Sequence, residues 1–140
     1  MAFLLRLAIV FCACACLARP CDCAGTLTVN EAKKLAAVVF RGAITAFRNS
    51  DSGERFVVFR VTRVWKGNVS EIFEMPAFAE TTACLGFWPS FLSIGNELLV
   101  YASQEGSPPA YFTSVCTRTA LAKNSKDFEK LGRGKTPRAK

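Results

Sequence analysis

The chain has 140 residues, 51% of them hydrophobic, which is the size and apolar content of one globular domain with a packed core. It contains no histidine, which excludes a protease triad with a histidine base and any histidine-ligated metal site. The formal charge of +7 is unevenly placed, because eight basic and two acidic residues follow Thr117 whereas the charges from Arg19 to Thr117 cancel. We therefore expect a non-enzymatic domain with a neutral body and a basic C-terminal segment.

The first residues have the pattern of a secretory signal peptide. Arg6 precedes an apolar run, residues 7–17, that is too short to span a bilayer and ends in small residues. We predict a signal peptide over residues 1–18, with cleavage after Ala15 as the alternative site. The protein is then a secreted monomer without a membrane span, either extracellular or periplasmic, and a lipid anchor at Cys16 is the alternative.

Four of the seven cysteines lie beyond this signal. Cys21 and Cys23 are one residue apart, whereas Cys84 and Cys116 stand alone downstream. A disulfide between Cys21 and Cys23 would be strained, so each is expected to pair with a distant cysteine, and the spacing leaves both pairings open. Either pairing fastens the start of the domain to the middle of its fold. On the chain-entropy model, loops this long stabilise the fold by about 4 to 5 kcal/mol each.

The residues that follow predict a short helix and then a long β-hairpin. Thr28 and Glu31 have the spacing of a capping box, which predicts a helix over residues 28–36. Two runs rich in β-branched and aromatic residues, 38–47 and 55–65, flank a segment of turn composition. In the second run, apolar residues alternate with more polar ones, as in a barrel strand with one face on the core.

The remainder of the chain predicts three more strands and a final helix. The helix begins at Asn124 or Ser125, runs through Leu131 and is stopped by Gly132. Together these elements predict a mainly β fold with short flanking helices. The simplest such architecture is an OB-like five-stranded Greek-key barrel over residues 19–132, with a small sandwich as the alternative. The strands are expected at residues 71–78, 97–103 and 110–118, and residues 133–140 are expected to form a flexible basic tail.

Six short motifs keep a fixed order relative to the cysteines. They are Cys21-Asp22-Cys23, residues 39–42 (VFRG), residues 61–67 (VTRVWKG), Cys84 followed by Gly86, Gly95 ahead of residues 98–102 (LLVYA), and residues 116–119 (CTRT). In this order they resemble the netrin-like domain of the tissue inhibitors of metalloproteinases, over nearly the whole mature chain. The resemblance implies an OB-like barrel with disulfides from Cys21 to Cys84 and from Cys23 to Cys116.

The resemblance also implies an activity, inhibition of a metalloendopeptidase. In inhibitory members of the family, the amine and carbonyl of the first cysteine chelate the zinc of the protease, and the next side chain enters the specificity pocket. No cofactor of the chain's own is implied, since the only metal contact is that of the Cys21 backbone with the zinc of a target metalloproteinase. Whether the mature chain begins before Arg19 or at Cys21 stays open. The matching wedge here consists of Cys21, Asp22, Ala83, Cys84 and Leu85.

The basic C-terminal segment indicates a different class of function. Its cations can attract heparan-like glycans or anionic envelope polymers through a salt-sensitive field, which would make the chain a non-inhibitory extracellular or envelope adaptor. Nucleic acid is not an expected partner, because an exported chain rarely meets it and aromatic residues are not interleaved with these cations. A solvated tail is the plain alternative. The candidate polyanion-binding residues are Lys123, Lys126, Lys130, Arg133, Lys135, Arg138 and Lys140.

Two smaller features have two interpretations each. Residues 68–70 (NVS) match an N-glycosylation sequon on a predicted turn, which has meaning only in a eukaryote. Phe87, Trp88 and Phe91 follow Cys84 closely and form either core under the disulfide or an exposed contact patch.

Overall fold

A computed structural model describes residues 21–78 and 84–139 of the chain. The predicted signal peptide, Cys16, Ala83 and Lys140 lie outside the described residues. Within the described part, no helix is long and apolar enough to cross a membrane.

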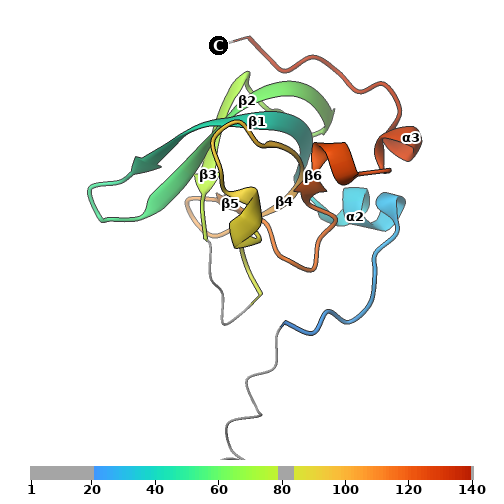
Figure 1. The fold of residues 1–140 in the computed structure, drawn as a ribbon, viewed down its shortest axis with the longest axis horizontal. Coiled ribbons are helices and arrows are strands. Elements are labelled where there is room, and N and C mark those ends of the chain that lie inside the picture. Colours follow the sequence, from blue (N-terminus) through green and yellow to red (C-terminus); the bar gives the residue numbers. More distant parts are fainter. Residues whose placement is uncertain (1–20, 79–83, 140) are drawn as a thin grey trace, which may run out of the picture.

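The described residues form a curled antiparallel sheet with short helices (Figure 1). Along the sheet the order is β3-β2-β1-β4-β5, and β6 pairs with β4 off this path. Three successive strands followed by a fourth that returns beside the first make a Greek key. The mainly β fold with short helices predicted from the sequence is confirmed. The strands are β1 (Val38–Asn49), β2 (Arg55–Lys66), β3 (Ile72–Pro76), β4 (Glu97–Glu105), β5 (Ala110–Phe112) and β6 (Ala120–Leu121).

The sheet curls into a half-barrel. Its path ends at β3 and β5, and in the described residues no backbone ladder joins these two strands. They meet instead through side chains, because the rings of Phe73 and Tyr111 pack edge to face with centroids 5.0 Å apart. Phe73 also packs on Phe40 of β1, at 5.2 Å between centroids. The barrel expected from the sequence thus takes the form of a curled sheet with aromatic rings between its edge strands.

The main core is built by the strands' inward faces. In β2, Val57, Phe59 and Val61 are buried, while Arg60 and Thr62 between and beyond them are exposed. This is the alternation that the sequence predicted. Full burial of a valine or phenylalanine side chain stabilises a fold by about 1.5 to 3 kcal/mol, so this strand alone contributes much of the stability.

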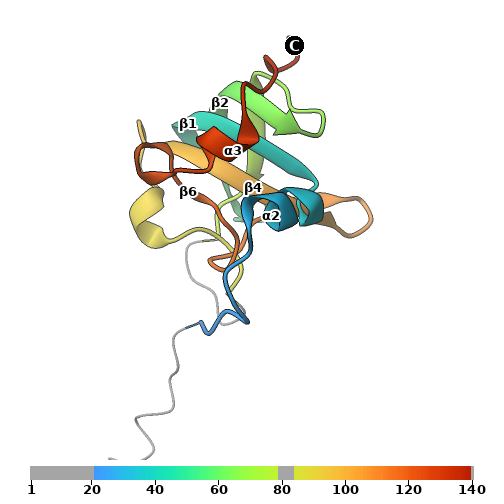
Figure 2. The ribbon, with the colours of Figure 1, turned by 90° about the vertical axis from the view of Figure 1, so that its right-hand side faces the viewer.

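A second apolar cluster lies on the other face of β1 and β4. There α2 (Val29–Leu35) and α3 (Phe128–Leu131) cover the sheet, as Figure 2 shows from that side. The predicted capping box of α2 is confirmed, since the Glu31 amide donates to Thr28 Oγ1 at 3.3 Å and the Thr28 amide donates to Glu31 Oε2 at 2.8 Å. These helices bury the outward side chains of both strands.

The last third of the chain differs from the prediction in detail. The strand expected over residues 110–118 ends at Phe112, because the chain turns at residues 114–117 before β6. The helix expected from Asn124 or Ser125 is split into η3 (Ala122–Asn124) and α3, with Asp127 as the N-cap of α3. Gly132 ends α3 with a φ of 72°, as predicted. A further short turn of helix, η2 (Pro89–Phe91), precedes β4.

Residues 133–139, which the sequence predicted as a flexible tail, pair with the edge of β2 and with the turn after it through isolated β-bridges. Lys135 and Val64 exchange two backbone hydrogen bonds of 2.7 and 2.9 Å. Arg138 then donates to the carbonyl of Val69 at 3.0 Å and accepts from the amide of Glu71 at 3.0 Å. The segment arches over β2 in Figure 1. Basic composition did not reveal this, because backbone pairing leaves little mark on side-chain chemistry.

Candidate functional site

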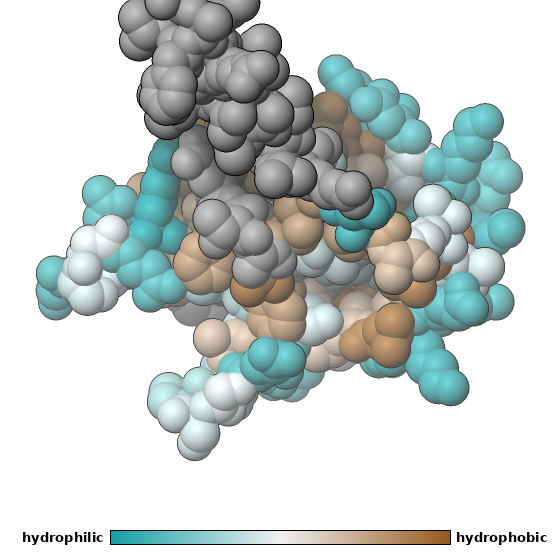
Figure 3. Space-filling view, turned by 90° about the horizontal axis from the view of Figure 1, so that it is seen from below, coloured by the Kyte–Doolittle hydropathy of each residue, from teal (hydrophilic) through white to brown (hydrophobic). Residues whose placement is uncertain are grey.

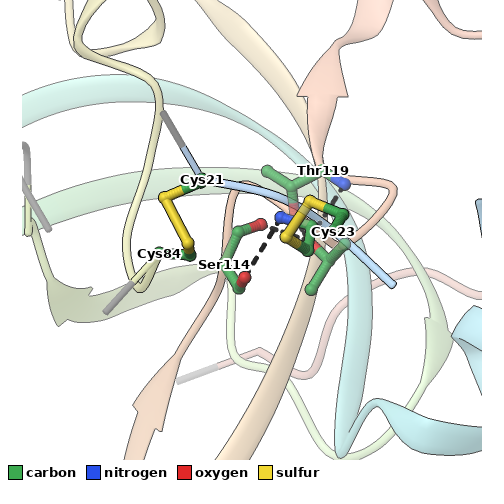
Figure 4. Close-up of a disulfide and its surroundings, with 7 residues drawn as sticks. Cys21, Cys23, Cys84, Ser114 and Thr119 are labelled. Carbon is green, nitrogen blue, oxygen red and sulfur yellow. Dashed lines mark hydrogen bonds between the residues drawn. A yellow bond between two sulfur atoms is a disulfide. The ribbon is translucent and has the colours of Figure 1, made fainter. Parts of the chain in front are cut away.

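Two disulfides fasten the N-terminal segment to the rest of the fold (Figure 4). Cys21 is bonded to Cys84 and Cys23 to Cys116, with Cα atoms 5.5 and 5.4 Å apart. This is the pairing that the resemblance implied. Disulfides persist in oxidising compartments, so these two bonds fit an extracellular type of environment.

The two downstream cysteines lie on paired backbone. The amide of Val115 donates to the carbonyl of Cys84 at 3.0 Å, and Leu85 forms a β-bridge with Ser114. Ser114 lies between the two disulfides in Figure 4, where its Oγ accepts a 3.1 Å hydrogen bond from the Cys116 amide. The N-terminal segment is therefore anchored to a hydrogen-bonded frame.

The frame depends on tight backbone geometry after Cys84. Cys84 itself has a φ of 58°, in the left-handed region that non-glycine residues rarely adopt. Gly86 has a φ of 101°, and a Cβ there would collide with the backbone of Phe78. This collision explains why the motif places a glycine two residues after the cysteine. Leu85, which lies between Cys84 and Gly86, is exposed.

The structure brings most of the predicted wedge together. Asp22 is exposed between the two half-buried cysteines that flank it, and Leu85 is 39% exposed beside Cys84. The disulfide between Cys21 and Cys84 joins these two segments side by side. Ala83, the remaining member of the predicted wedge, lies outside the described residues.

Two exposed aromatic residues flank Cys84 and Leu85 in the sequence. Phe78 and Trp88 are 40% and 48% exposed, whereas Phe87 is 2% exposed and belongs to the main core. Phe91 is half-buried and packs against the same core. Of the two interpretations of these aromatic residues, burial therefore holds for Phe87 and exposure for Trp88. Seen from below, apolar side chains gather in the middle of the molecular face (Figure 3).

Two open grooves share the segment of residues 23–27 as a wall. The larger, of about 480 Å³, is completed by residues 115–120 and 124–127. The smaller, of about 330 Å³, is completed by Glu31 and Cys116. We name this shared wall, residues 23–27, the N-terminal ridge.

An ion pair that sequence reasoning missed lies in the wall of the larger groove. Arg118 binds Asp127 through Nη2 and through Nε, the latter at 2.7 Å from Oδ2, and Arg118 Nη1 donates to the carbonyl of Leu27 at 2.8 Å. Tyr101 donates its hydroxyl to Asp127 Oδ2 at 2.8 Å. The sequence held one hint of this ion pair, because Asp127 is one of only two acidic residues after Thr117.

Burial and hydrogen bonding set the protonation of this ion pair. Burial acts to raise the pKa of Asp127, but the hydrogen bonds from Arg118 and Tyr101 outweigh it, and the pKa lies below its ordinary value. For Tyr101, burial and the neighbouring Asp127 carboxylate both raise the pKa. Asp127 is therefore ionised and Tyr101 neutral near neutral pH. The pair connects the N-terminal ridge to β4 and α3.

The candidate polyanion-binding residues fall into groups by element. Lys126 lines the larger groove and Lys123 is the middle residue of η3, whereas Lys130 belongs to α3. The residues on the docked C-terminal segment are Arg133, Lys135 and Arg138, and Lys140 lies outside the described residues. All six described cations are exposed. Asn68 of the sequon is also exposed, in the turn between β2 and β3.

The described residues contain no group of three or more cysteine, aspartate or glutamate side chains arranged to hold a metal ion. Comparisons of the chain with models of known families and with curated proteins find no match. The fold and the two bonds define the chain as a disulfide-stapled β half-barrel.

Proposed function

We propose that this chain is a secreted protein-binding domain that inhibits a metalloendopeptidase through the edge made by Cys21, Asp22, Cys84 and Leu85. The observation that carries the proposal is the disulfide between Cys21 and Cys84, which holds two exposed segments side by side with Asp22 pointing away from the core. A wedge of this kind needs little ordering on binding, because both segments are already fixed.

The chemistry of the wedge requires a trimmed N-terminus. When Cys21 is the first residue, its neutral amine and its carbonyl oxygen form a compact pair of donors for a zinc ion that keeps an open coordination position. When Arg19 and Pro20 precede it, the same nitrogen belongs to a peptide bond and cannot donate. The inhibitory form is therefore the one that begins at Cys21.

The proposal also constrains the target. Asp22 would carry its carboxylate into the specificity pocket, at a desolvation cost of several kcal/mol unless the pocket supplies a partner. The exposed Leu85 and Trp88 are available for apolar contacts at the rim. We therefore propose a target whose pocket presents a cation or hydrogen-bond donors to Asp22.

The test compares three N-terminal forms of the secreted protein. One begins at Cys21, one retains Arg19-Pro20, and one carries an added alanine before Cys21. Inhibition constants are measured against a panel of extracellular zinc metalloendopeptidases. We expect inhibition by the first form alone. Equal inhibition by all three forms would place the contact elsewhere on the surface, and lack of inhibition by all three would remove the proposed activity.

A second candidate function is that of an adaptor for anionic polymers of the matrix or envelope. It is favoured by the exposure of the six described candidate polyanion-binding residues, none of which takes part in the three ion pairs found among the described residues.

A further inference from the structure

The C-terminal segment occupies a free edge of β2. The pairing of β2 with β3 ends where Arg60 meets Ile72, so the edge of β2 beyond Arg60 is left without a neighbouring strand of the sheet. The segment pairs with this edge at Val64 and then with residues 69–71. Its backbone is therefore held at two points.

Trp65 fixes the entry to this segment. Its Nε1 donates to the carbonyl of Gly132 at 2.9 Å, and its ring packs on Phe128 with centroids 5.5 Å apart. Gly134 passes so close that a Cβ there would lie 2.9 Å from Trp65 Nε1 and 3.2 Å from the carbonyl oxygen of Val64. Its φ of 68° also disfavours a side chain. Docking thus depends on a glycine at position 134.

Docking brings several cations to one edge of β2. Arg133, Lys135 and Arg138 are exposed, and Arg63, which precedes the paired residue Val64, is exposed as well. The acidic residue Glu71 lies beside this segment, because its backbone amide donates to the carbonyl of Arg138. Lys135 and Arg138 are three residues apart, at most about 10 Å along the chain. We name Arg63, Arg133, Lys135 and Arg138 the docked basic surface.

We propose that the docked basic surface is a preorganised binding site for a linear polymer that carries closely spaced sulfate or phosphate groups, and that binding and docking stabilise each other. This inference rests on the adaptor function given above as the second candidate. Several fixed cations bind a polyanion with less loss of chain entropy than a free tail does. A ligand that binds only the docked state must also favour that state.

The experiment measures affinity for a heparin oligosaccharide and for polyphosphate by titration, together with amide hydrogen exchange. In the full-length secreted protein we expect the bound polymer to slow exchange at the amides of Val64, Lys135 and Arg138, which make the docking bonds. The two polymers distinguish a sulfated glycan from a phosphate-rich polymer as the preferred source of the anions.

Two variants of the protein distinguish the effect of docking on polymer binding from the effect of the positive charges. Gly134→Ala leaves the net charge unchanged but pushes the segment off Trp65, and we expect faster exchange at Lys135 and about tenfold weaker binding. Its control is Gly53→Ala, which also substitutes a glycine with positive φ, of 83°, but in open space at the hairpin turn. This control should bind like the original protein.

Lys135→Gln with Arg138→Gln removes two charges but keeps the backbone bonds. We expect normal exchange protection, weaker binding and a salt dependence of log affinity reduced by roughly two. The matched control is Arg48→Gln with Arg55→Gln, because Arg55 lies about 30 Å from Val64 along β2. This control should change binding much less.

Three outcomes would overturn the proposal, and they are distinguishable. If Gly134→Ala exposes the amides yet binds at full strength, the cations act as a free tail and the preorganised site is lost, while the adaptor function stands. If the polymer binds the original protein without slowing exchange at these amides, the coupling is absent. If neither polymer binds at physiological salt, the adaptor function fails together with the proposal.

Discussion

Trp65 and Gly132 are 67 residues apart in the chain, yet the indole nitrogen of one donates directly to the carbonyl oxygen of the other. The bond links the end of β2 to the end of α3, at the point where the C-terminal segment begins. Phe128 packs on the same indole ring, so β2, α3 and the docked segment meet at one side chain. Four predictions about stability concern this region and the ion pair at Asp127.

Trp65→Phe should lower the free energy of unfolding by about 1 to 2 kcal/mol, because it removes a hydrogen bond and leaves a small void. Urea denaturation measures the change. Trp88→Phe is the matched control, since Trp88 is 48% exposed, and it should change stability by less than about 0.5 kcal/mol. Equal effects of the two substitutions would contradict the role of Trp65 as the anchor of the C-terminal segment.

Deletion of residues 133–140 should destabilise the protein by about 2 kcal/mol. It removes four backbone hydrogen bonds, each worth about 1 kcal/mol net, and part of this gain is offset by the entropy of the released segment. Thermal and urea unfolding of the two forms give the difference. An unchanged midpoint of unfolding would mean that the segment is not docked in solution. That result would agree with the flexible tail predicted from composition.

Asp127→Asn should lower the free energy of unfolding by about 2 to 3 kcal/mol, because it leaves Arg118 without its carboxylate partner. Arg118 is partly exposed, so solvent screens the pair and the effect lies at the low end for buried ion pairs. Glu129→Gln is the control, because Glu129 is the neighbouring exposed acid on α3 and takes part in none of the described ion pairs.

The Asp127 carboxylate also makes the free energy of unfolding depend on pH. The pKa of Asp127 is lower in the folded than in the unfolded state, so its contribution is present above the unfolded value of about 3.9 and is lost as pH falls through the folded value. Unfolding free energies measured from pH 6 to pH 2 should therefore fall more steeply for the original protein than for Asp127→Asn. Parallel curves would show that Asp127 is not paired in the folded state.

The sequence predicted those parts of the fold that side-chain patterns determine. The capping box at Thr28 and the alternation from Val57 to Val61 are local signals, and both elements form as predicted. The docked C-terminal segment escaped prediction because backbone atoms hold it, and a basic composition is equally compatible with a free tail. The docked segment requires a glycine at position 134, where a Cβ would crowd Trp65, but glycine is also common in disordered tails and gave no signal in the sequence.

The candidate site was also predicted only in part from the sequence. The cysteine spacing excluded a bond between Cys21 and Cys23, but only the resemblance distinguished the two remaining pairings, and the structure forms the pairing it implied. The ion pair of Arg118 and Asp127 could not be derived, because it requires the turn at residues 114–117 and the split of the final helix. Charge balance in the C-terminal segment indicated only that Asp127 was unusual.

The final prediction concerns the residue that follows Cys21. In the form that begins at Cys21, Asp22→Thr should strengthen inhibition of metalloendopeptidases whose specificity pocket is apolar, because an uncharged side chain enters without losing the hydration of a carboxylate. Toward a protease with a cationic pocket the same substitution should weaken inhibition, since an ion pair is lost. Inhibition constants against both kinds of protease measure the difference. Glu31→Gln, which alters an exposed acid of α2 beside the ridge, serves as the control for a general change of charge. If Asp22→Thr leaves both constants unchanged, Asp22 does not enter the pocket, and the contact with the protease must be made by another part of the surface.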